Sequence, residues 1–124
     1  MSENGFLTRE AILAERPVRI EEVQIPEWGG VVLVRQLSGA QRDALIDDMG
    51  QTDQNGDYHP KPNASARYCV ATICDRQGQL LFEKADMVAL AEKEGAALER
   101  IYSETKTFNG FFRKLDGAAV KTSD

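Results

Sequence analysis

Alternating apolar and polar positions in the first third of the chain predict a β-hairpin. Apolar residues recur at positions 18, 20, 23 and 25, and a second β-branched run follows over residues 31–37. The connection between them, residues 26–30, contains a proline, the only tryptophan and a Gly-Gly pair, which lets the backbone take positive φ and reverse direction. The alternation slips at Glu21 and Glu22, so we expect a bulge or a bend in the first strand.

Two capping sequences predict helices on either side of this hairpin. Thr8 can cap a short helix over residues 9–15. Ser38 and Gln41 match a capping box that opens a second helix, which ends near Gly50. The hairpin therefore lies between two helices along the chain.

The second half of the chain has helical periodicity. One helix starts at Asn63 or Ser65, another covers residues 85–94, and a third covers residues 96–108 before an Asn-Gly stop. The apolar segment 80–82 is expected to return to the core. The residues expected to face the core from the helices are Ala66, Cys69, Val70, Ile73, Met87, Val88, Leu90, Leu98, Ile101, Tyr102 and Thr105.

These elements predict a helix-dominated α+β fold in which an N-terminal β-hairpin packs with four or five α-helices. At 124 residues the chain fits a single domain, 1–124. We expect its ends, residues 1–5 and 113–124, to fray. The polar stretch 51–62 predicts a mobile loop, although the Asn-Gly pair at its centre could instead close a small hairpin.

The composition is that of an ordinary globular protein with an acidic surface. Hydrophobic residues make up 42% of the chain and charged residues 28%, and the net charge is −5. Lysine and arginine are scattered, without a run or a stripe, which argues against a nucleic-acid partner. No apolar stretch approaches the roughly 20 residues needed to span a bilayer, and the N-terminus has no signal-peptide pattern. We therefore expect no membrane partner.

No set of residues has the spacing of a catalytic, metal or cofactor site. The only histidine, His59, and the two cysteines, Cys69 and Cys74, do not match a zinc site, and the thiols are expected to be buried and reduced. Adjacent acidic residues are typical of a solvated face rather than of an acid–base pair. The Gly-Gly pair is not followed by the Gly-Lys-Ser/Thr of a phosphate-binding loop. We therefore predict no enzyme activity, no metal and no cofactor.

Several apolar side chains are candidates for a protein interface. Trp28 lies at the hairpin tip, where it either covers the core or contacts a partner. Three phenylalanines gather at the end of the last helix, where a core position and an interface position are both open: Phe108, Phe111 and Phe112. The short N-terminal helix adds Ile12 and Leu13.

The order of several short strings resembles one protein family. The strings are FLTREAILA (6–14), IPEWGG (25–30), VRQLSGAQRD (34–43), DRQGQLLF (75–82), DMVAL (86–90), ALERI (97–101) and FNG (108–110). None of them carries chemistry, and their order and spacing over most of the chain make the case. Together they resemble the tail assembly chaperones of long-tailed phages and prophages.

The resemblance implies a non-enzymatic role in viral morphogenesis. Such a protein binds the tape measure protein, a very long helical chain, and keeps it soluble while tail tube protein, a further expected partner, polymerises around it. One small protein covers little of a long client, so we expect self-association into an open oligomer through head-to-tail contacts. The protein would then stay in the cytoplasm of the bacterial host and be absent from the mature virion.

Two other classes are alternatives to this reading. The first is a head–tail connector or minor tail protein, which would be a permanent part of the particle. The second is a small DNA-binding regulator with a helix-turn-helix. The stretch of about twelve residues after the Ser38 helix is much longer than the 3–4-residue turn of that motif, and the acidic charge also argues against it.

Overall fold

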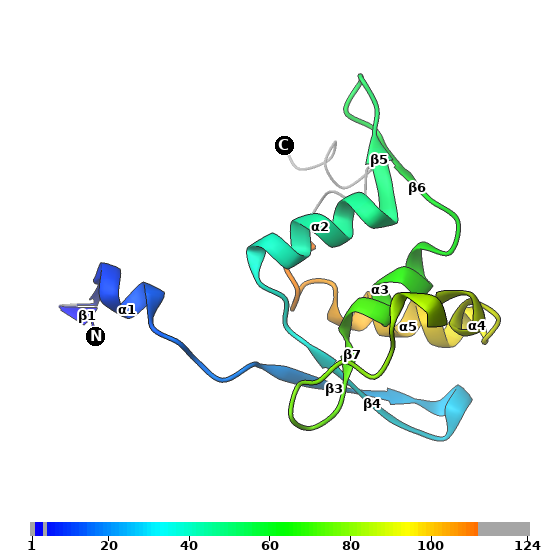
Figure 1. The fold of residues 1–124 in the computed structure, drawn as a ribbon, viewed down its shortest axis with the longest axis horizontal. Coiled ribbons are helices and arrows are strands. Elements are labelled where there is room, and N and C mark those ends of the chain that lie inside the picture. Colours follow the sequence, from blue (N-terminus) through cyan, green and yellow to red (C-terminus); the bar gives the residue numbers. More distant parts are fainter. Residues whose placement is uncertain (1, 4, 112–124) are drawn as a thin grey trace.

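The hairpin predicted from the alternation forms most of a three-stranded antiparallel sheet (Figure 1). β3 (Ile20–Ile25) pairs with β4 (Gly30–Arg35), and β4 pairs along its other edge with β7 (Ile73–Cys74). The connection is a 3-10 turn, η1 (Pro26–Trp28), followed by Gly29 at a φ of 69°, a left-handed conformation that costs glycine little. The structure is a computed structural model and describes residues 2–3 and 5–111.

The bulge expected at Glu21 and Glu22 is wrong. The β3–β4 register runs without interruption from Ile20 opposite Arg35 to Ile25 opposite Gly30. Val23 and Ile25 face the core, and Ile20 belongs to the opposite, outer face of the strand. Ile20 stays half-buried on that outer face, so the strand does not need an extra residue to turn it toward the core.

The structure contains five α-helices within residues 5–111, which confirms the helix-dominated α+β fold with its N-terminal hairpin. They are α1 (Arg9–Leu13), α2 (Gly39–Met49), α3 (Ala64–Thr72), α4 (Met87–Ala91) and α5 (Gly95–Thr105). The caps predicted at Thr8 and Ser38 are both present. β7 was not predicted, because Ile73 continues the apolar stripe of α3 in the sequence although the helix ends at Thr72.

Tyr68 on α3 is the centre of the core. Its side chain is fully buried, and its ring packs edge-on against Tyr102 and Phe111, with centroids 5.1 and 5.5 Å away. Its hydroxyl lies 2.6 Å from Thr105 Oγ1 and accepts a hydrogen bond from Asn109 Nδ2 at 3.0 Å. Because every buried polar atom of this trio has a partner, the network holds α3, α5 and the turn after α5 together.

Most of the predicted core positions are confirmed. Ala66, Cys69, Val70, Ile73, Leu90, Leu98, Ile101, Tyr102 and Thr105 are buried, and Met87 packs against them. The expectations for Leu80, Leu81 and Val88 are wrong, because these side chains remain 45%, 56% and 65% exposed. A 3-10 turn, η2 (Lys84–Asp86), precedes α4 and leaves it only five residues long, so only one narrow face of that helix reaches the core.

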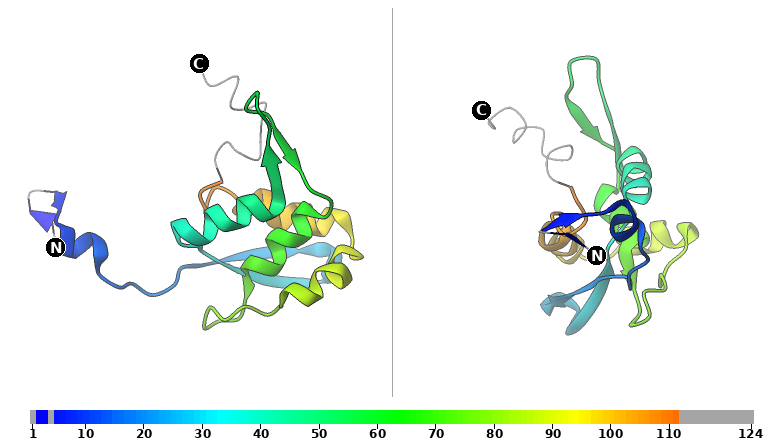
Figure 2. Two further views of the ribbon diagram at one scale, coloured as in Figure 1. Left: turned by 45° about the horizontal axis from the view of Figure 1, so that its top comes forward. Right: turned by 90° about the vertical axis from the view of Figure 1, so that its left-hand side faces the viewer.

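Residues 50–60 form a two-stranded hairpin that projects from the body (Figure 2). β5 (Gly50–Thr52) pairs with β6 (Tyr58–Pro60), and Gly56 takes a φ of 86° in the connection. Of the two alternatives for this stretch, the structure thus shows the hairpin. Gly50 admits no side chain, because a Cβ there would meet the Tyr58 ring and the His59 carbonyl.

Residues 2–3 and 5–19 form an arm that extends away from the rest of the described residues (Figures 1 and 2). The arm consists of β1 (Ser2–Glu3), β2 (Phe6–Leu7), α1 and a connecting segment, residues 14–19. It meets the body where Gln36 N donates to Arg19 O at 2.8 Å, and a Cβ at Gly78 would come within 3.4 Å of the Val18 side chain. None of the helices in the described part of the chain is both long and apolar enough to cross a membrane.

Candidate functional site

An apolar groove opens between α2, α3 and the segment 80–87. Its volume is about 620 Å³, within the range of sites that bury a small ligand or several side chains. Its apolar lining consists of Leu37, Ala44, Leu45, Val70, Ala71, Leu80, Phe82 and Met87. Its charged lining consists of Arg35, Asp48, Arg67, Glu83 and Lys84. We refer to this surface as the groove.

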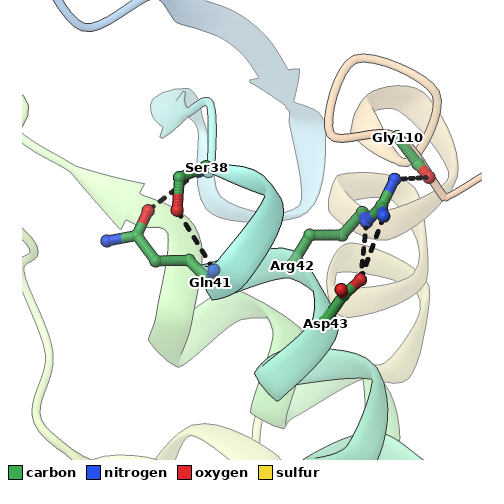
Figure 3. Close-up of polar contacts among 5 residues, drawn as sticks. All are labelled: Ser38, Gln41, Arg42, Asp43 and Gly110. Carbon is green, nitrogen blue, oxygen red and sulfur yellow. Dashed lines mark hydrogen bonds and ion pairs between the residues drawn. The ribbon is translucent and has the colours of Figure 1, made fainter.

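The α2 wall is fixed at its N-terminal end by two local interactions (Figure 3). Ser38 Oγ accepts from Gln41 N at 3.1 Å while Gln41 Oε1 accepts from Ser38 N at 2.9 Å, so the capping box is reciprocal. One turn along, Arg42 donates to Asp43 Oδ1 and reaches the Gly110 carbonyl at 3.5 Å. The start of α2 is therefore attached to the turn that follows α5.

Asn109 strengthens this attachment. Its Oδ1 accepts from Leu37 N at 2.7 Å, and its Nδ2 donates to Arg35 O at 3.3 Å. Gln36 Nε2 donates in addition to Phe108 O at 3.0 Å. The sequence predicts Asn109 only as part of a helix stop, whereas the structure uses its side chain to set the direction in which the chain enters α2.

The α3 wall is tied to α2 by Arg67. Its Nη1 lies 3.3 Å from Asp48 Oδ1, and its Nε donates to Pro62 O. Arg35, on β4, donates from Nη1 to Gly78 O at 2.8 Å, and its buried Nε has no hydrogen-bond partner among the residues that the structure describes. The groove therefore contains one guanidinium that is paired with a carboxylate and another with an unused donor.

The third wall of the groove, the segment 80–87, is fixed near its start by backbone hydrogen bonds and leaves apolar side chains exposed. Leu81 N donates to Ile73 O at 3.0 Å, which extends the sheet edge by one bond. Glu83 N donates to Asp86 Oδ2 at 2.8 Å and opens η2. The side chains of Leu80 and Leu81 nevertheless stay about half exposed, and Leu80 lines the groove.

The arm presents a second apolar surface. Phe6, Leu7, Ile12 and Leu13 are 76%, 62%, 54% and 63% exposed, and α1 buries no residue. The helix is nevertheless locally complete: Thr8 Oγ1 accepts from Ala11 N, and the Arg16 guanidinium donates to the Ala11 and Ile12 carbonyls. Ile12 and Leu13, both predicted as interface candidates, thus lie on an open surface.

The other predicted interface candidates lie in different settings. Trp28 is half-buried against the core, and its Nε1 donates to Glu94 Oε1 at 2.9 Å. Phe111 is 2% exposed, so of the two positions that the sequence left open, core or interface, it occupies the core. Phe108 is half-buried, with the Arg19 guanidinium 5.9 Å from its ring centre, and Phe112 lies outside the described residues.

Sequence reasoning missed the groove because its lining comes from four separate stretches. Only two features of the sequence point to it. One is the pair of small residues at Ala44 and Ala71, which leave space where larger side chains would fill it. The other is the apolar Leu-Leu-Phe segment at 80–82, which has no helical or strand period of its own.

The titratable groups give little support to catalysis. Burial raises the pKa of the Cys69 thiol to about 12, so it stays protonated at neutral pH and is a poor nucleophile. His59 lies on the exposed β5–β6 hairpin and contacts Asp53 Oδ2 at 2.7 Å. Within residues 2–3 and 5–111, no group of three or more His, Cys, Asp or Glu residues is placed to hold a metal ion.

Comparison with known proteins gives these surfaces a context. The family model described as phage tail assembly chaperone matches residues 7–110. Among solved structures, the tail assembly chaperone of bacteriophage HK97 has a similar fold, with a TM-score of 0.53 and 18% sequence identity over 85% of this chain and 95% of that one. A comparison with curated protein sequences found no match.

Proposed function

This chain belongs to the family of phage tail assembly chaperones, and we propose that it acts in tail assembly by binding the tape measure protein without catalysing a reaction. The observation that carries the proposal is the open apolar groove between α2, α3 and the segment 80–87. An unfilled apolar surface on an acidic protein is typical of a protein-binding site.

The shape of the groove suits an amphipathic helix. Two helices and a short segment form its walls, and helix-in-groove recognition uses apolar side chains at i, i+3 or i+4 and i+7. A long tape measure helix with an apolar stripe would otherwise aggregate through that stripe. Covering the stripe removes apolar surface from water, and the net charge of −5 helps to keep the complex dispersed.

Co-expression with the tape measure protein of the same genome tests this proposal. We expect the client to become soluble and to co-purify with the tagged chain. Ala44→Asp places a charge in the groove at an exposed helical position, so it should abolish co-purification and leave the fold intact. Ala96→Asp, at an exposed position of α5 away from the groove, is the matched control and should behave as the parent chain.

A client that stays insoluble with the parent chain would overturn the proposal. Mass spectrometry of purified particles separates the remaining roles. A chaperone that works in the host cytoplasm and leaves before completion is absent from the virion, whereas a head–tail connector or minor tail protein is present in fixed copy number. Binding to tail tube protein can be scored in the same co-purification.

A further inference from the structure

We propose that the groove recognises an amphipathic helix that carries a carboxylate next to its apolar stripe, and that Arg35 binds this carboxylate. The inference rests on the proposed binding of the tape measure protein and adds the chemistry that selects one segment of such a client. An apolar stripe alone does not distinguish one amphipathic helix from another, whereas a charged partner for Arg35 does.

Arg35 is held in position at the end of β4 and has a donor left over. Its Nη1 donates to Gly78 O at 2.8 Å, which fixes the guanidinium against the turn after β7. Its buried Nε has no hydrogen-bond partner among the described residues. None of the ion pairs within residues 2–3 and 5–111 includes Arg35. Its positive charge therefore has no carboxylate partner in that part of the chain.

Arg67 shows how the same groove satisfies a different guanidinium. Its Nη1 lies 3.3 Å from Asp48 Oδ1, and its Nε donates to Pro62 O at 3.1 Å. Among the residues that the structure describes, the groove thus supplies a carboxylate for Arg67 and none for Arg35. The molecule that fills the groove can supply the one for Arg35.

Filling the groove increases the need for this partner. Arg35 is half-buried, so water can reach part of its side chain while the groove is open. An apolar helix packed into the groove would remove that water and leave the charge with one carbonyl acceptor. Burying a charge without a partner is costly, whereas a carboxylate would form a charge-assisted hydrogen bond. The groove therefore disfavours a helix that is apolar throughout and favours one with an acidic side chain.

The charge of the whole groove supports the same partner. Its lining has three basic residues against two acidic ones, a net charge of +1, in a chain whose net charge is −5. Because Arg67 is paired with Asp48, Arg35 and Lys84 remain against Glu83. An acidic helix is attracted by this surface and repelled by the acidic surplus elsewhere, so the charge distribution directs it to the groove.

The place of Arg35 in the groove determines where the carboxylate lies on the bound helix. Arg35 lines the groove together with Leu37 and Leu80. Side chains three or four residues apart share one face of a helix, so the carboxylate should lie one turn from an apolar anchor. Lysine is a poor replacement for Arg35, because a planar guanidinium can bind a carboxylate while its Nη1 stays on Gly78 O.

Overlapping peptides that tile the tape measure protein of the same genome test the inference on the unaltered full chain. Fluorescence anisotropy at low ionic strength measures the affinity of each labelled peptide. We expect the bound peptides to combine apolar residues at helical spacing with Asp or Glu within one turn of them. Replacing that acid by its amide should weaken binding about tenfold or more, since a hydrogen bond between charged groups is lost. Bound peptides whose acids can all be replaced without loss would overturn the inference.

Variants of the chain locate the partner of this carboxylate. Arg35→Gln should bind the acidic peptide about as weakly as the parent chain binds the amide peptide, and combining both changes should cause little further loss. Arg35→Lys should recover only part of the affinity. Arg76→Gln removes the same charge at an exposed position outside the groove, so it should bind as the parent chain does. Independent losses that multiply would contradict the pairing of Arg35 with the carboxylate.

The outcomes separate this inference from the proposal on which it rests. Ala44→Asp should abolish peptide binding, and a peptide that still binds this variant lies outside the groove and overturns the inference. An insoluble client together with no bound peptide overturns the proposed function and this inference with it. A client that becomes soluble through peptides indifferent to their acids overturns the inference alone. The amide series uses the parent chain, so the test is decisive even where Arg35→Gln fails to fold.

Discussion

The body and the arm of this molecule use similar sequence patterns with opposite results. In the body, the capped helix α2 buries Leu45, Ile46 and Met49 and packs against α3 and β5. In the arm, the capped helix α1 buries nothing, although it also carries adjacent large apolar residues. The comparison teaches that a local cap and an apolar face define a helix, but not the surface that the helix covers.

The difference also separates two uses of apolar residues. Buried side chains in the body stabilise the monomer, whereas exposed side chains on the arm and around the groove are available to another protein. Mutations in the two regions should therefore affect different measurements. The predictions that follow compare the regions from the largest expected effect to the smallest.

Two isoleucines give the sharpest contrast. Ile101 is fully buried in α5, so Ile101→Ala should lower the free energy of unfolding by about 2–5 kcal/mol, from lost burial and the cavity left behind. Ile12 is 54% exposed, so Ile12→Ala should change it by less than about 0.5 kcal/mol. Urea denaturation at low protein concentration measures both. Equal losses would show that the arm packs on its own body.

Asn109 tests the attachment of α2 to the turn after α5. Asn109→Ala removes the acceptor for Leu37 N and the donor to Arg35 O and to the Tyr68 hydroxyl. We expect a loss of about 2 kcal/mol, because the buried partner groups are left without hydrogen bonds. Gln41→Ala, which removes one exposed hydrogen bond of the capping box, is the milder control. A loss no larger than that of the control would contradict the role given to Asn109.

The two helix caps should differ in the same way. Ser38→Ala should cost about 1 kcal/mol of global stability, because α2 is coupled to the core. Thr8→Ala should leave the unfolding midpoint unchanged, because α1 is not coupled to the body. The Thr8 change should instead raise the amide exchange rate of Ala11 and Ile12. A midpoint shift from Thr8→Ala would show that the arm is part of the cooperative unit.

The smallest effect concerns pH and the β5–β6 hairpin. The hydrogen bond to His59, and then the one from the Asp57 amide, lower the pKa of Asp53 below 3.8. A carboxylate whose pKa is lower in the folded state than in the unfolded state stabilises the folded state when the pH is above the unfolded-state pKa. This contribution is lost as the pH falls through the folded-state pKa. We expect the hairpin to loosen below pH 3.8 while the body stays intact.

Amide chemical shifts of Asn55 and Asp57 follow this transition, since both N–H groups donate to Asp53 Oδ1. His59→Ala should move the transition to higher pH, because the largest cause of the lowered pKa is removed. A transition that is unchanged in this variant would contradict the assignment. Exposed groups of this kind have little influence on global stability.

The fold was largely predictable because its determinants are local. The alternation at Val23 and Ile25 and the turn at Gly29 define the hairpin, and Ser38 with Gln41 defines the start of α2. The helical stripe at Leu98 and Ile101 identifies the buried face of α5. In each case the period or the cap depends only on neighbouring residues.

The errors occur where local pattern and tertiary packing disagree. The spacing of apolar residues predicts that Ile73 belongs to the helix, but in the structure it follows α3 and pairs with Val34 on the sheet. The apolar pattern predicts Leu80 and Val88 as core residues, but both side chains stay exposed because η2 shortens and redirects the segment 80–91. Periodicity cannot distinguish an apolar residue that the core has room for from one that it does not.

The sequence by itself determined most of the secondary structure, the family resemblance and the net acidic charge, because these depend on neighbouring residues, on the order of short strings and on composition. Only the tertiary structure decided that Phe111 is a core residue, that Ile12 and Leu13 stay exposed, and that α2, α3 and residues 80–87 enclose a groove. A groove is made of residues far apart in the chain, and whether it stays open depends on how tightly its walls pack.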